Sequence, residues 1–119
     1  MNVEELRTYC ISKKGVTEEF PFDESTLVFK VMGKMFALTG LNDEEQTVNL
    51  KCEPEYAIEL REEYSDDILP GYHMNKKYWN TVNYAGGLKD DFVKQLVDHS
   101  YEQVVLGLTK KLKNELYSL

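Results

Sequence analysis

Apolar residues near the start of the chain recur at helical spacing, which predicts a helix over Val3–Lys14. Asn2 can cap it, and Glu5 stands three residues on, as in a capping box. The residues on its apolar face are Val3, Leu6, Tyr9 and Cys10. The next segment, Glu18–Asp23, contains a proline and cannot be regular helix, so we expect an extended connector with its two phenylalanines anchored in the core.

The middle of the chain alternates with period two, which predicts strands. Leu27–Met32 and Met35–Leu41 form a hairpin around the two-residue loop Gly33-Lys34, and glycine in the first loop position favours a type II′ turn. Gln46–Cys52 is expected to be a third strand. Its inward residues are Val48, Leu50 and Cys52, and its outward residues are Thr47, Asn49 and Lys51. These strands together predict an antiparallel meander.

The second half returns to helical spacing, interrupted by one further strand. Pro54 suits the first turn of a helix ending near Tyr64, and its expected packing contacts are Ala57, Ile58 and Leu60. Trp79–Tyr84 is rich in strand-favouring residues, and 66–71 is expected to be a loop. Leu88–Leu116 is helical, with a break expected near residues 98–100. This order predicts an α+β fold in a single domain, residues 1–119.

Composition narrows the function classes. Hydrophobic residues make up 42% and charged residues 29% of the 119, which is typical of a globular protein. The sequence has neither a membrane-length apolar run nor an apolar N-terminal signal, so we expect a cytoplasmic protein without membrane contact. Cys10 and Cys52 are interpreted as reduced and buried, and His73 and His99 lack metal-ligand spacing.

Sequence motifs for catalysis are missing. The chain contains no glycine-rich phosphate loop, no HExxH and no GxSxG. The acidic residues around 59–67 lack the spacing of a calcium loop. We therefore expect no catalytic residue, no cofactor and no metal, and a non-enzymatic function is favoured.

The charge is negative overall but unevenly distributed. A formal net charge of −7 argues against a general nucleic-acid binder. However, seven acids lie in 53–67, and none lies in 68–89. In this acid-free segment Lys76 and Lys77 can meet phosphate, and several neighbours can stack on bases or hydrogen-bond to them: Tyr72, Tyr78, Trp79, Asn75 and Asn80. The alternative is that the aromatic residues are core residues and the lysines are solvated.

The run PGYHMNKKYWNTV at residues 70–82 resembles the signature PGYHxNKxxWxTV of the MmcQ/YjbR family of small bacterial proteins. Further segments resemble the family in the same order: 20–22, 27–37, 50–55 and 100–101. The resemblance implies a CyaY-like fold, with a curved antiparallel sheet packed against helices. It also implies DNA binding by a "double wing" arrangement. The signature residues at matching positions are Lys34, Lys51, His73, Lys76 and Trp79.

Three functions follow as hypotheses. In the first, the protein is a monomer that binds DNA, with contacts from Lys34, Lys51, His73, Lys76, Lys77 and Trp79. For this hypothesis we predict that Lys34 and Lys76 share the face of Lys51, which alternates outward. In the second, the protein binds a small molecule or anion in a pocket formed by His73, Lys51, Lys76 and Trp79. In the third, the acidic face of the helix that begins at Pro54 contacts another protein.

Overall fold

The computed structural model describes residues 1–42 and 44–119 and has six strands and four helices within them. Their bounds are α1 Val3–Ile11, β1 Val16–Glu19, β2 Thr26–Val31, β3 Lys34–Gly40, β4 Thr47–Lys51, α2 Pro54–Glu63, β5 Ile68–Pro70, β6 Trp79–Asn83, α3 Asp90–Leu106 and α4 Lys110–Tyr117. All neighbouring strands pair antiparallel in one sheet of order β1-β2-β3-β4-β6-β5. The fold is therefore α+β, as the sequence predicted.

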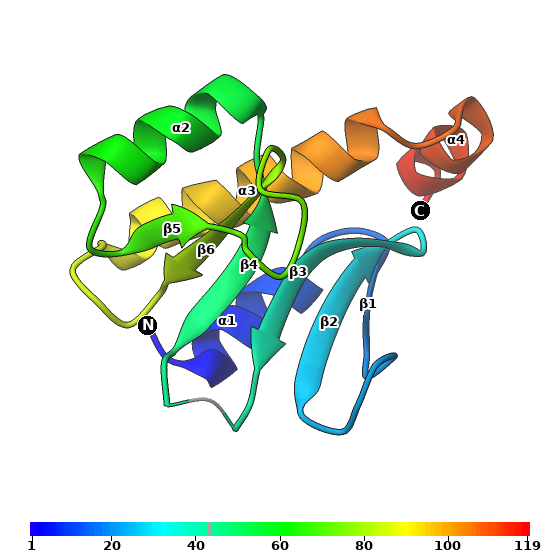
Figure 1. Ribbon diagram of the computed structural model, residues 1–119. Helices are drawn as coiled ribbons and strands as arrows, with labels where there is room; N and C mark the ends of the chain where they lie inside the picture. The colour runs from blue at the N-terminus through cyan, green and yellow to red at the C-terminus, as the bar shows by residue number, and fades with distance from the viewer. Residues whose placement is uncertain (43) are drawn as a thin grey trace.

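The helices gather on one face of the sheet. Figure 1 shows α1 and α3 behind the strands and α2 above them, whereas the face toward the viewer carries no described helix. α3 packs across β2, β3 and β4, and α2 packs beside β5. The buried residues that join these layers include Leu6, Phe29, Val48, Leu60, Val82, Val93 and Val97. The helix-covered side therefore holds the main core, and the other side is here called the open face.

The first helix has the predicted start but a shorter end. Asn2 and Glu5 form the complete capping box. α1 ends at Ile11, before the predicted Lys14, and Gly15 then takes a φ of +76° that glycine adopts without strain. This bend turns the chain directly into β1.

The expected connector is partly a strand, and the prediction about its aromatic residues is wrong. β1 pairs with β2 from Val16 to Glu19. Phe20 and Phe22 are 50% and 63% exposed. Pro21 has no N–H to continue the hydrogen-bond ladder between β1 and β2, so the chain leaves the edge of the sheet there. No described helix covers this edge, and both phenylalanine side chains are therefore exposed.

The hairpin turn is one residue earlier than predicted and of a different type. Val31 pairs with Lys34, so Met32 and Gly33 form the loop. Their φ values of +49° and +84° are those of a type I′ turn rather than II′. The register then shifts so that Phe36 is an extra residue, a β-bulge that bends β3.

The third strand matches its prediction and a short strand was missed. In β4, Val48 and Leu50 are buried in the main core, while Thr47, Asn49 and Lys51 alternate to the open face. The loop expected at 66–71 contains β5, which pairs with β6. In α2, Ala57 and Leu60 are buried as predicted, but Ile58 is 52% exposed because it lies on the outer side of the helix.

The expected break at residues 98–100 is wrong. α3 is one helix of 17 residues that continues through Ser100 and ends before Gly107. Ser100 lies on the buried face of α3 instead of capping a new helix. Thr109 caps α4 by accepting from the Leu112 N–H. None of the helices described is long and apolar enough to cross a membrane.

Candidate functional site

The open face of the sheet is floored by cross-strand pairs from β4 and β6. Lys51 pairs with Trp79, and Asn49 pairs with Thr81. Residues directly opposite one another in an antiparallel pair share a face, so these four side chains lie on the side away from the main core. The Thr81 hydroxyl donates to Asn49 Oδ1 at 2.7 Å, which holds both polar groups in place.

A small apolar cluster lies at the centre of this face. Val28, Leu38 and Trp79 are buried there, and Met35 and Met74 pack against them. Met74 comes from the loop 71–78, so this loop lies against the sheet. Trp79 is only 8% exposed, which makes it a support for the loop rather than a free surface for stacking.

Loop 71–78 is fixed by its own backbone. The Gly71 N–H donates to the Trp79 carbonyl at 2.9 Å, and the Met74 N–H donates to the Gly71 carbonyl at the same distance. Asn75 Oδ1 accepts from the Lys77 N–H at 2.9 Å. A Cβ on Gly71 would lie 2.9 Å from the Trp79 backbone oxygen, so the close approach needs glycine.

Arg61 ties α2 to this loop. Its Nε donates to Asn80 Oδ1 at 2.6 Å, and its guanidinium also donates to the Lys76 carbonyl. Asn80 is 2% exposed and its amide donates to the Ala57 carbonyl. Asn80 is thus a structural group, contrary to the hypothesis that it contacts bases. The sequence held one signal for this role, because Arg61 is the single base within the acidic run 53–67.

The lysines of the loop lie over exposed tyrosines. Lys76 Nζ is 5.0 Å from the ring centre of Tyr72, and Lys77 Nζ is 5.5 Å from that of Tyr78. These are cation–π distances. Tyr72 is 63% and Tyr78 39% exposed. The segment therefore presents two pairs of a cation and an aromatic ring to solvent.

The other predicted cations are divided between the two sides of the sheet. Lys51 faces the open side, and so does Lys30, which pairs with Glu19 at 2.8 Å. Lys34 is paired with Val31, whose side chain lies in the main core. Its position is therefore on the helix-covered side, at the exposed end of the hairpin. The register of the type I′ turn is the reason that Lys34 does not join Lys51.

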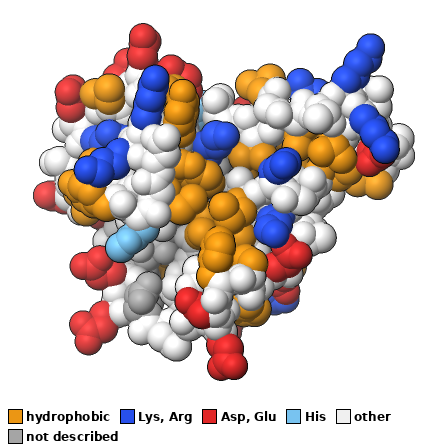
Figure 2. Space-filling view, turned by 45° about the vertical axis from the view of Figure 1, so that its right-hand side comes forward, with side chains coloured by type: hydrophobic (Ala, Val, Ile, Leu, Met, Phe, Trp, Pro, Cys, Tyr) orange, Lys and Arg blue, Asp and Glu red, His pale blue; other side chains and the backbone are white. Residues whose placement is uncertain are grey.

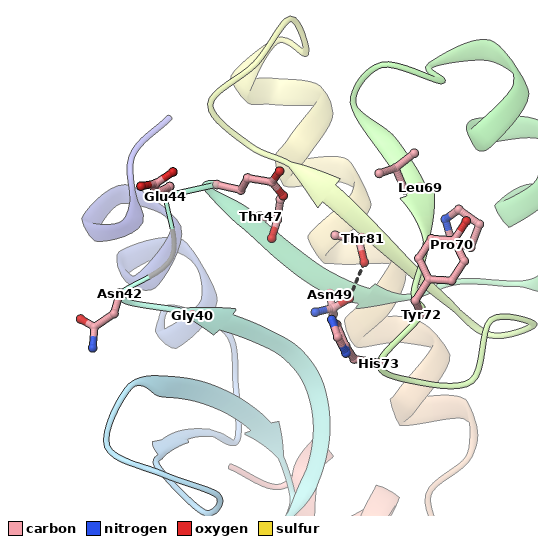
Figure 3. Close-up of a pocket in the computed structure, with 11 residues that line it drawn as sticks. Gly40, Asn42, Glu44, Thr47, Asn49, Leu69, Pro70, Tyr72, His73 and Thr81 are labelled. Carbon is pink, nitrogen blue, oxygen red and sulfur yellow. Dashed lines mark hydrogen bonds between the residues drawn. The ribbon is translucent and has the colours of Figure 1, made fainter.

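His73 lines a groove of about 570 Å³ between loop 71–78 and residues 40, 42, 44, 45 and 47. Figure 3 shows His73 beside Asn49, near the hydrogen-bonded Thr81, with Tyr72 close by. Glu44 and Glu45 also line it. Of the described residues, those lining this groove do not include Lys51, Lys76 or Trp79. The structure therefore does not unite His73 with these three in one pocket.

Two residues of α3 secure the end of β4. The Ser100 hydroxyl donates to the Phe36 carbonyl at 2.5 Å and accepts from the Lys51 N–H at 2.8 Å. His99 Nε2 accepts from the Glu53 N–H at 3.1 Å, and burial lowers the pKa of His99, which favours this neutral acceptor. These contacts position the backbone that carries Lys51.

The two cysteines lack the surroundings of a reactive thiol. Burial raises the pKa of the Cys10 and Cys52 thiols to about 12, so both are poor nucleophiles. Across residues 1–42 and 44–119, no three of the His, Cys, Asp and Glu side chains form a group that could hold a metal ion.

Charges of both signs border an apolar patch on one face of the molecule. Figure 2 shows Lys and Arg side chains on both sides of this patch, with Asp and Glu side chains at the top, along the left edge and below. Glu44 and Glu45 border the groove of His73. The molecule thus has a locally basic, aromatic region despite a net charge of −7.

The model of the YjbR family matches residues 11–103 of the chain. The chain belongs to the YjbR family. The matched segment runs from the end of α1 to within α3, so it includes the open face and loop 71–78, while α4 lies outside it. All six site residues predicted from the sequence fall within this YjbR segment.

Relatives and a solved structure agree with this membership. The chain is 35% identical over 119 residues to the Escherichia coli K12 protein YjbR, covering 100% of both chains. It is 35% identical over 92 residues to E. coli O157:H7 YbdF, covering 77% of this chain and 75% of YbdF. The crystal structure of Deinococcus radiodurans DR2400, with the domain DUF419, is similar at a TM-score of 0.89 and 40% identity, covering 97% and 87%. These names state no activity, so the function of this YjbR-family chain is argued from its site.

Proposed function

We propose that this protein binds single-stranded DNA through the open face of its sheet and loop 71–78. The observation that carries the proposal is the pair of cation–aromatic contacts, Lys76 over Tyr72 and Lys77 over Tyr78, on a fixed loop beside Lys51. Aromatic rings stack on bases of any sequence, and lysines meet the phosphates between them. This surface therefore offers both kinds of contact, aromatic rings for the bases and lysines for the phosphates.

The form of the loop supports an interface with little reorganisation. Its internal hydrogen bonds and the Arg61 contact hold Lys76 and Lys77 before any ligand arrives. Preorganisation lowers the entropy lost on binding. Lys51 projects from a strand secured by α3, so its position is equally defined.

Charge favours a single strand over a duplex. The net charge of −7 opposes the dense phosphate charge of a duplex, whereas stacking on Tyr72 and Tyr78 rewards unpaired bases. We expect weak, salt-sensitive binding with a preference for single strands.

The same proposal covers the fold type, the cellular location, the oligomeric state and the role of the β2–β3 hairpin. The family resemblance supports a CyaY-like fold, and we propose with it a cytoplasmic location and action as a monomer. The double-wing description uses the hairpin at Met32-Gly33 as a wing. We propose that the hairpin contributes less than the loop, since Lys34 lies on the other side of the sheet from Lys51.

The test is fluorescence anisotropy of a labelled oligothymidine of roughly 15 nucleotides, and of a duplex of equal length, over a salt series. The variants are Lys51→Ala and Lys76→Ala. Each should weaken single-strand binding and lower the slope of log affinity against log salt by about 0.7. Lys14→Ala is the matched control. Lys14 is an exposed lysine that follows α1, and its carbonyl accepts a hydrogen bond from Tyr101 of α3, so it lies on the helix-covered side of the sheet.

The outcomes are distinct. Binding that loses affinity in both site variants but not in the control supports the proposal. Equal losses in all three variants would mean that only net charge matters. The absence of binding to either DNA at low salt would overturn the proposal.

A small-molecule function is the second candidate, and the groove of about 570 Å³ beside His73 favours it. Its size lies within the range typical of ligand pockets. Screening metabolites by thermal shift, with His73→Ala as the comparison, tests this candidate. A compound that stabilises the wild type but not the variant would support it, and no stabilising compound would count against it.

A further inference from the structure

The groove beside His73 and the cations of the open face share one strand. Asn49 lines the groove and Lys51 follows two residues later on the same face of β4. Two residues of a strand span about 6.6 Å. This length is close to one nucleotide of an extended strand, so a nucleotide whose phosphate meets Lys51 can place its base over Asn49.

The groove walls suit a flat ring with hydrogen-bond donors. Leu69, Pro70 and Tyr72 give it apolar and aromatic surface on one side, as Figure 3 shows for their labelled side chains. Glu44 and Glu45 line it as well, and an ionised carboxylate only accepts hydrogen bonds. A phosphate would be repelled here, whereas an amino group would find acceptors.

The floor adds a defined polar pair. Thr81 donates its hydroxyl proton to Asn49 Oδ1, which leaves the hydroxyl oxygen as an acceptor and the Asn49 amide N–H groups as donors. Asn49 and Thr81 are half-buried, so the pair is accessible from the groove. The floor can therefore recognise the edge of a ring that carries both an amino group and a ring nitrogen or carbonyl.

We infer that this groove holds one base of the bound strand and selects a base with an exocyclic amino group, cytosine above thymine. Cytosine carries an amino group where thymine carries a carbonyl oxygen, and carboxylates characteristically accept from that amino group. Thymine would point its carbonyl oxygen at the carboxylates. The inference rests on the proposed function, because it assigns one base of the strand to a subsite.

The experiment compares two labelled oligonucleotides of roughly 15 nucleotides, oligothymidine and the same strand with central cytidines, by anisotropy with the full chain. The cytidine strand should bind about five-fold or more tightly. In the double variant Glu44→Gln/Glu45→Gln the preference should disappear, since glutamine offers a donor as well as an acceptor. Glu59→Gln/Glu62→Gln makes the same charge change on the exposed side of α2 and should keep the preference.

Failure of the subsite can be separated from failure of the proposed function. Equal affinity of the wild type for both strands overturns the subsite while DNA binding stands. Retention of the preference in Glu44→Gln/Glu45→Gln overturns it as well. If neither strand binds at low salt, the proposed function is overturned and the subsite falls with it.

Discussion

Ser100 connects three elements through one hydroxyl group. It donates to the carbonyl of Phe36, the bulged residue of β3, and accepts from the N–H of Lys51 in β4. The bulge leaves Phe36 outside the regular ladder, so its carbonyl needs another partner. Ser100 supplies this partner from the buried face of α3, where it is fully enclosed.

Ser100→Ala should lower the free energy of unfolding by about 1–3 kcal/mol, because two buried backbone groups lose their partner. In urea unfolding, the midpoint should fall while the slope stays unchanged. Ser118→Ala serves as the control, since its hydroxyl donates to the Glu115 carbonyl in an exposed position. A midpoint equal to that of the control would contradict the role of Ser100.

His99 should make stability depend on pH below neutrality. Burial lowers its pKa, with Glu102 and Glu53 opposing this shift, whereas the imidazole of the unfolded chain titrates near its ordinary value of 6.5. A lowered folded pKa means that the unfolded chain takes up the proton first as pH falls. The stabilisation is therefore complete above pH 6.5 and is lost progressively as pH falls from 6.5 through the folded pKa.

The measurement is the free energy of unfolding of the wild type and of His99→Gln between pH 7.5 and pH 5.5. Glutamine keeps an acceptor for the Glu53 N–H but does not titrate, so the variant should lose less stability across this interval. Titratable groups that do not interact with His99 are present in both proteins and cancel in the comparison, whereas the interactions of His99 with Glu102 and Glu53 are part of its own contribution. Parallel pH profiles would show that His99 is not the sensor.

At the scale of elements, loop 71–78 depends on one glycine. Gly71→Ala places a Cβ 2.9 Å from both the Cβ and the carbonyl oxygen of Trp79, which is closer than such atoms approach. We expect a loss of about 1–3 kcal/mol in the free energy of unfolding from this overpacking. Under the proposed function the affinity for single strands should also fall, since Lys76 and Lys77 move with the loop.

Gly107→Ala is the matched control for this change. Gly107 has a φ of −85°, and a Cβ there would meet only the Val104 and Gln103 carbonyl oxygens at ordinary distances of 3.5 and 3.9 Å. Its stability should be unchanged or slightly raised, because alanine restricts the unfolded chain. Equal stability of Gly71→Ala and the control would show that the loop yields without cost.

Elements specified by local pattern were predicted well, and elements specified by distant partners were not. The alternation of β4 and the proline of α2 are readable within a few residues. β5 has three residues, one of them proline, and is a strand only because β6 pairs with it. His99 and Ser100 suggested a break in the helix, because the backbone groups that they bind lie 46 and 64 positions away in the sequence.

The candidate site was predictable by composition but not by arrangement. The acid-free segment led to Lys76, which lies over Tyr72, and to Lys77, which lies over Tyr78. The groove beside His73 requires residues 40, 42, 44, 45 and 47, which are adjacent to His73 only in the folded chain. Lys34 was grouped with Lys51 because a family signature gives residue types, whereas the side of the sheet depends on turn register.

At the scale of the whole molecule, the acidic surface should limit DNA binding without taking part in it. α2 carries exposed acids away from the open face, and their field extends about 30 Å at 0.01 M salt but only about 8 Å at 0.15 M. Each Glu→Lys exchange adds two positive charges, so Glu59→Lys/Glu62→Lys brings the formal net charge from −7 to −3. The electrostatic repulsion between the protein and an approaching DNA strand should fall accordingly.

This double variant should bind oligothymidine more tightly than the wild type at low salt, mainly through faster association, and the gain should vanish as salt is raised. Stopped-flow anisotropy at about 0.01 M and about 0.3 M salt separates the two regimes. Glu59→Gln/Glu62→Gln, which changes half as much charge, should give an intermediate gain. If the gain persists at high salt, the new lysines contact the strand directly and α2 is part of the interface; if no gain occurs at low salt, the affinity is set by the open face alone.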